Sequence, residues 1–127
     1  MDAHLAALAT TTAQELFARS RTDRWHRSRD ELTGLLARFS PGGVDREALT
    51  DELEDSREEF LTARLEGDPA AADDVEAGWR ARLRRLLRAS PALAGPLRDL
   101  LARWSAADDR QEGAGPPYRP GPGVRSC

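Results

Sequence analysis

Residues 68–104 have the sequence DPAAADDVEAGWRARLRRLLRASPALAGPLRDLLARW, which contains the start signals of two consecutive helices. Asp68 is a suitable N-cap, and Pro69 suits the first helical position because its missing N–H costs no hydrogen bond there. Ser90 and Pro91 repeat this signal. Apolar residues follow each start at intervals of three and four. The stretch therefore predicts two helices that pack through a seam of leucine and tryptophan.

Three further helices are predicted before this stretch: over residues 2–20, from Thr22 or Asp23 to Phe39, and over residues 45–66. The turn sequence SPGG, residues 40–43, ends the second of these helices, and Asp45 can cap the third. No Gly or Pro interrupts residues 18–24. The sequence thus leaves open whether the first two helices are separate or continuous, and we favour a break or bend between them.

Pro96 leaves a second alternative open in the last helix. Either the helix bends at Pro96, or residues 91–95 form a turn and the main helix begins at Pro96. Beyond this helix, eight of residues 113–123 are Gly or Pro, a composition that cannot form a core. The sequence therefore predicts a helical bundle over residues 1–106 and a disordered tail over residues 107–127.

The composition indicates an all-α protein. The chain has 127 residues, with 17 Leu and 21 Ala but only three Val and no Ile, and all 19 basic residues are Arg. Leucine, alanine, arginine and glutamate form helices well, whereas the β-branched residues that favour strands are scarce. Short connections between amphipathic helices favour antiparallel neighbours. We therefore expect a small antiparallel bundle of four to five helices.

Charge is distributed unevenly along the chain. Residues 45–76 contain 13 acidic residues and three Arg, whereas residues 80–103 contain seven Arg and one Asp. If the third and fourth helices form an antiparallel hairpin about Asp68, the two groups neutralise each other. The pairs expected from that geometry are Arg82 with Glu54, Arg84 with Glu52, and Arg85 with Asp51. The alternative is that the arginines face outward and contact the phosphates of a nucleic acid.

Catalytic and metal-binding patterns are missing from the sequence. His26 lies near Asp23 and Asp30, but zinc needs three or four ligands, so a histidine that faces solvent is the favoured interpretation. No catalytic or phosphate-binding motif is found. We expect no enzyme activity, no cofactor and no metal. A lone cysteine, Cys127, and the lack of a long apolar run predict a cytoplasmic protein without a membrane contact.

Two leucines of the predicted third helix lie outside its apolar stripe. Leu61 and Leu65 lie more than a right angle round the helix from the stripe that contains Leu53 and Phe60. Surplus apolar surface of this kind is suited to packing against a helix of a partner.

The segment WRARLRRLLRASPALAGPLRDLL, residues 79–101, has a Trp, an Arg-Leu-Arg-Arg-Leu-Leu run, a Pro and a Leu-Leu pair in this order. This pattern resembles a helical module of actinobacterial proteins of uncertain function, and the likeness spans roughly residues 20–104. That module often lies at the N-terminus of longer modular proteins, which implies an interaction or assembly role without catalytic residues. Pro96 departs from the helix-compatible residue usual at its position.

These features predict a non-enzymatic adaptor or assembly module that binds a protein partner or a second copy of the chain. The alternative is a small regulator that binds nucleic acid, which is the less favoured partner because the acidic helix can neutralise the basic one. The residues expected to contact a partner are Arg80, Arg84, Arg85, Arg88, Leu61 and Leu65.

Overall fold

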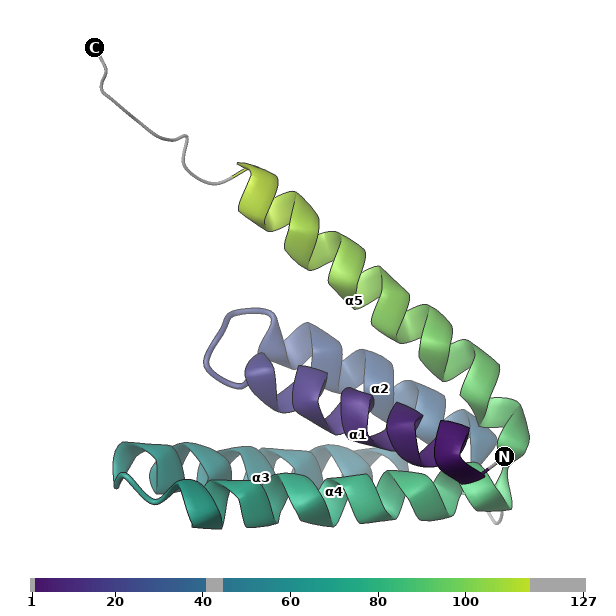
Figure 1. Ribbon diagram of the computed structural model, residues 1–127, viewed down its shortest axis with the longest axis horizontal. Helices are drawn as coiled ribbons and strands as arrows, with labels where there is room; N and C mark the ends of the chain where they lie inside the picture. The colour runs from purple at the N-terminus through teal and green to yellow at the C-terminus, as the bar shows by residue number, and fades with distance from the viewer. Residues whose placement is uncertain (1, 41–44, 115–127) are drawn as a thin grey trace.

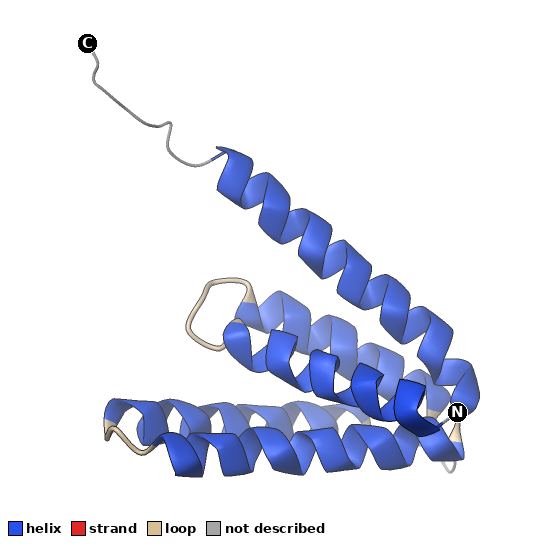
Figure 2. Ribbon diagram, in the orientation of Figure 1, coloured by secondary structure: helices blue, strands red, loops and turns tan. Residues whose placement is uncertain are grey.

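The structure is a computed structural model that describes residues 2–40 and 45–114. Within these residues it contains five α-helices, one 3₁₀ turn and no strand (Figure 2). The elements are α1 (Asp2–Ala18), α2 (Trp25–Phe39), α3 (Arg46–Leu65), α4 (Pro69–Ala89), η1 (Pro91–Leu93) and α5 (Ala94–Ala114). The predicted all-α fold is confirmed. Most of the SPGG turn and residues 115–127 of the predicted tail lie outside the described residues.

The helices follow one another in alternating directions and form two layers with a fifth helix across them (Figure 1). In one layer α3 and α4 lie side by side as a hairpin. The other layer consists of α1 and α2, with α1 packed on α4 and α2 packed on α3. Helix α5 runs obliquely over this second layer and contacts both α1 and α2.

The core lies between these layers and draws side chains from every helix. Its largest fully buried members are Trp25, Phe17, Leu16, Leu32, Leu36, Leu49, Leu53, Leu83, Leu87, Leu93, Leu97 and Leu100. Each helix buries apolar side chains along one face, so a single apolar stripe per helix is enough to enclose this core. None of the helices in the described part of the chain is long and apolar enough to cross a membrane.

The predicted starts of α3 and α4 are confirmed by their capping bonds. The carboxylate of Asp45 accepts a hydrogen bond from the Glu47 backbone N–H at 3.1 Å, and that of Asp68 accepts one from Ala71 at 3.1 Å. Pro69 is the first residue of α4. Between the two helices Gly67 has φ +72°, a conformation that side chains with a Cβ disfavour, so this glycine permits the tight reversal.

The first two helices are separate, as favoured, but neither predicted cap begins α2. The N-cap is Arg24, which makes no side-chain capping bond. Thr22 instead accepts a hydrogen bond from the Arg24 backbone N–H at 3.2 Å and donates one to the Arg19 carbonyl at 2.9 Å. The threonine therefore stabilises the turn between the helices rather than the start of α2.

Pro96 lies within α5 rather than at its first residue. The 3₁₀ turn ends at Leu93 and α5 starts at Ala94, so Pro96 lies in the first turn of the helix. Backbone N–H groups in that turn have no partner within the helix, and a proline there removes no helical hydrogen bond. The separate turn of the second alternative is therefore present, but it covers residues 91–93 rather than 91–95, and the helix starts two residues before Pro96.

The tail boundary predicted at residue 107 is too early, because α5 continues to Ala114. Residues 107–112 contain neither Gly nor Pro, so the local sequence does not stop the helix there. Asp108 also forms ion pairs with Arg19 and Arg24, which join this part of α5 to the turn between α1 and α2.

Candidate functional site

Each of the three tryptophans joins two helices through its indole N–H. The rings are largely buried, and a buried indole N–H normally needs an acceptor. The bonds are Trp25 to Glu54 at 2.6 Å, Trp79 to Ser56 at 2.8 Å, and Trp104 to Glu31 at 3.0 Å. Two of them reach α3 and the third reaches α2, so the tryptophans orient these helices as well as filling the core.

A guanidinium group also lies over each tryptophan ring. The distances from the Arg Cζ atom to the ring centroid are 5.5 Å for Arg57 over Trp25, 5.0 Å for Arg82 over Trp79, and 4.9 Å for Arg19 over Trp104. These are cation–π contacts at favourable range. These contacts help to hold the three arginine side chains against the core.

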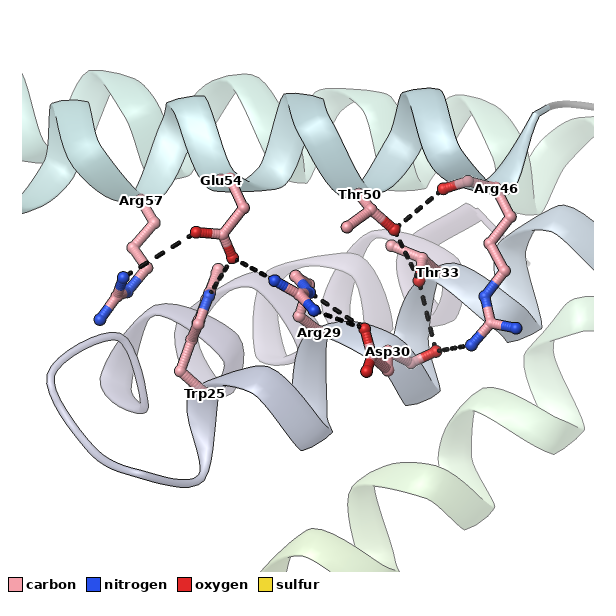
Figure 3. A network of polar contacts seen from close by, with 8 residues as sticks. All are labelled: Trp25, Arg29, Asp30, Thr33, Arg46, Thr50, Glu54 and Arg57. Carbon is pink, nitrogen blue, oxygen red and sulfur yellow. Dashed lines mark hydrogen bonds and ion pairs between the residues drawn. The ribbon is translucent and has the colours of Figure 1, made fainter.

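Glu54 is the centre of the polar network between α2 and α3 (Figure 3). Its carboxylate accepts hydrogen bonds from Trp25 and from Arg29 at 2.7 Å, and Arg57 lies 3.9 Å away. Burial alone would raise the pKa of Glu54. The hydrogen bonds from Trp25 and Arg29 and the charges of Arg29 and Arg57 outweigh burial and lower this pKa below its ordinary value.

The lowered pKa of Glu54 predicts a loss of stability in acid. An ionised Glu54 stabilises the fold above the unfolded-state pKa of about 4.3, and this contribution disappears as the pH falls from there through the lowered pKa. Glu54→Gln should reduce the free energy of unfolding at pH 7. Below a pH of about 4 the free energies of unfolding of the variant and of wild type should differ less. Urea titrations at pH 7 and pH 3 measure this. Glu58→Gln, at an exposed position of the same helix, is the control. A constant difference across this range would contradict the assignment.

One ion pair joins α3 and α4 within the described residues, and none of the three expected pairs forms. Arg82 pairs with Glu52 at 2.9 Å rather than with Glu54. Arg82 and Glu52 each lie 15 positions from Gly67, so the hairpin is centred on this glycine and not on Asp68. Glu54 is instead directed toward α2, as described above.

The arginines of α4 divide into two that form ion pairs, Arg80 and the Arg82 described above, and three that form none within the described residues. Arg80 is half-buried and pairs with Glu76 of its own helix at 3.3 Å. Arg84, Arg85 and Arg88 are exposed, and no ion pair within the described residues involves them. The structure therefore leaves three of the four arginines predicted to contact a partner accessible to one.

Leu65 is the one large hydrophobic side chain that the described part of the chain leaves exposed, with 90% of its surface accessible. Leu61, one turn earlier, is half-buried. Both leucines line a hollow of about 330 Å³ on α3. The other lining residues are Glu54, Arg57, Glu58 and Thr62.

A larger groove, of about 510 Å³, was not predicted from the sequence. It lies between the turn after α1, the start of α2 and the C-terminal half of α5. Its polar and aromatic lining residues are Arg19, Arg24, Arg27, Ser28, Glu31, Arg103, Trp104 and Asp108. The only signal in the sequence is the high density of Arg in residues 19–29, which does not indicate where α5 will lie.

No cluster of three or more potential metal ligands is found among the described residues. His26 is exposed, as are Asp23 and Asp30. The geometry therefore gives these side chains no shared site.

Comparison with known proteins gives no assignment. No protein-family model matches the chain, and searches of curated proteins and of solved structures found no significant match.

Proposed function

We propose that this chain is a non-enzymatic helical module that binds a protein partner, in the manner of an adaptor or assembly domain. The observation that carries the proposal is the exposed side chain of Leu65 beside Leu61 on α3. The pattern in residues 79–101, which resembles a helical module of actinobacterial proteins of uncertain function, implies an interaction or assembly role as well. A lone cysteine fits a cytoplasmic setting for this function.

The hollow beside Leu65 has the composition of a small contact surface. Leu61 and Leu65 supply apolar area, while Arg57 and Glu58 supply charged groups at its edge. Protein interfaces commonly combine an apolar centre with a polar rim. A leucine that is 90% exposed loses water-accessible apolar area when a partner covers it, which favours association.

A single charge in this hollow tests the proposal. Leu65→Glu should leave the thermal midpoint unchanged, because the side chain is exposed, and should abolish cross-linking of a stoichiometric partner or of a second copy. Ala48→Glu places the same charge at an exposed position near the other end of α3 and is the matched control. Cross-linking mass spectrometry in native lysate, with sedimentation of the pure protein, measures both outcomes. A strictly monomeric protein that cross-links to no stoichiometric partner contradicts the proposal.

A second candidate function is nucleic-acid binding by the face of α4. The exposed Arg84, Arg85 and Arg88 favour it, because exposed guanidinium groups contact phosphates readily. Fluorescence anisotropy with a random duplex and a random single strand at low salt tests it. Binding should weaken steeply with salt and be lost in Arg84→Glu with Arg88→Glu. The control makes the same charge change at Arg38 and Arg98, exposed on other helices. Absence of binding at low salt removes this candidate.

A further inference from the structure

We propose that the groove between the α1–α2 turn and α5 is a binding site for a phosphate group, either free or carried by a small organic molecule. This site is separate from Leu65 and from the arginine face of α4, so it does not depend on the function proposed above. Its lining residues come from residues 19–31 and residues 103–108, two segments that are distant in sequence and adjacent in the fold.

The charge in the groove matches a dianion. Four guanidinium groups line it, from Arg19, Arg24, Arg27 and Arg103, together with the two carboxylates of Glu31 and Asp108. The formal balance of these groups is four positive and two negative charges, a net of +2. A phosphate monoester carries nearly two negative charges at neutral pH. Charges that line a recess act more strongly than the same charges spread on an open surface.

Asp108 shows that two of these arginines, Arg19 and Arg24, already hold an oxyanion. Its two carboxylate oxygens accept one hydrogen bond each, from Arg19 at the end of α1 and from Arg24 at the start of α2. Arg19 is only 3% exposed and also bonds to Glu15, both at the carbonyl and at the carboxylate. This guanidinium is therefore held in place by its neighbours before any ligand arrives.

Arg27 and Arg103 are the groups available to a ligand. Both are exposed side chains that line the groove, and no ion pair within the described residues involves either of them. The planar fork of a guanidinium donates two parallel hydrogen bonds to phosphate oxygens. Arg24, which is 34% exposed and shares Asp108 with Arg19, lies beside them as a third donor.

Trp104 in the wall of the groove can report on binding by NMR. Trp104 is 5% exposed, donates its indole N–H to Glu31, and lies under the Arg19 guanidinium. A recess of about 510 Å³ is within the range of small-molecule sites, so a phosphate and an attached organic group both fit. Binding there should shift the NMR resonance of the Trp104 indole N–H more than those of Trp25 and Trp79.

The test is an NMR titration of the full chain at pH 7.5 and constant ionic strength, with inorganic phosphate and with O-phosphoserine. Saturable shifts at Trp104 are expected with at least one probe, and the tighter probe identifies the free or the esterified form. Arg27→Ala with Arg103→Ala should weaken binding by about tenfold or more, because it removes both available forks. Arg38→Ala with Arg98→Ala removes the same charge from exposed positions outside the groove and should leave the affinity unchanged.

Asp108→Asn separates a binding site from a purely structural ion pair. It removes the carboxylate that competes for Arg19 and Arg24, so phosphate affinity should rise severalfold even if the thermal midpoint falls. A purely structural role predicts a lower midpoint without tighter binding. The proposal is overturned by the absence of saturable shifts at Trp104, by equal weakening in the Arg38 and Arg98 control, or by unchanged affinity in Asp108→Asn.

Discussion

Leu83→Ala is expected to lower the free energy of unfolding by about 2–5 kcal/mol. Leu83 lies on α4 with 0% of its surface exposed, in the core between the two helical layers. The substitution removes buried apolar area and leaves a cavity that the surrounding helices fill only in part. A loss of this size is a large share of the stability of a typical small domain, about 5–15 kcal/mol. Urea denaturation monitored by circular dichroism measures it.

Leu65→Ala is the matched control for this prediction. It makes the same chemical change at a side chain that is 90% exposed, and surface substitutions of this kind change stability by no more than about 0.5 kcal/mol. If Leu83→Ala cost as little as Leu65→Ala, the apolar stripe of α4 would not be part of the core.

Trp25→Ala is expected to cost about 3–5 kcal/mol. The ring is 0% exposed and packs near Phe17, with 6.3 Å between ring centroids. The substitution also removes the surface under the Arg57 guanidinium and the indole N–H that donates to Glu54. The substitution therefore removes both the packing of the ring and its polar contacts. Equilibrium unfolding in urea at pH 7 measures the summed loss of unfolding free energy.

Trp25→Phe separates these two contributions. It keeps an aromatic ring in the core but removes the indole donor to Glu54. We expect a smaller loss than for Trp25→Ala, because most of the cost comes from the missing ring. Equal losses in the two variants would show that the hydrogen bond, rather than burial of the ring, accounts for the role of Trp25.

The ends of α3 and α4 could be predicted because their signals act over a few residues. The Asp45 and Asp68 carboxylates accept hydrogen bonds from backbone N–H groups two and three positions away. The positive φ of Gly67 is likewise a property of one residue, and it favours glycine at that position. Such contacts depend little on the rest of the chain. The exposure of Arg84 and Arg88 follows in the same way, from their positions on the helix opposite the leucine stripe.

Contacts between helices could not be predicted to the residue. The antiparallel hairpin of α3 and α4 was expected, but the partner of Arg82 is Glu52, because the reversal is centred on Gly67. Glu54 pairs across the other interface, with Trp25 and Arg29 of α2. A carboxylate on a helix can face either neighbour, and the packing of the whole core decides which one it meets.

The amino-acid sequence by itself determined the helical class, the apolar stripes and the capped starts of α3 and α4. It did so because these properties depend on propensity and on spacing within one or two turns. Only the tertiary structure decided that the end of α5 returns to the turn after α1, where Asp108 meets Arg19 and Arg24. Asp108 is more than 80 positions from each of these arginines in the sequence. Their meeting depends on how α5 crosses α1 and α2, which the side chains of the whole core determine together.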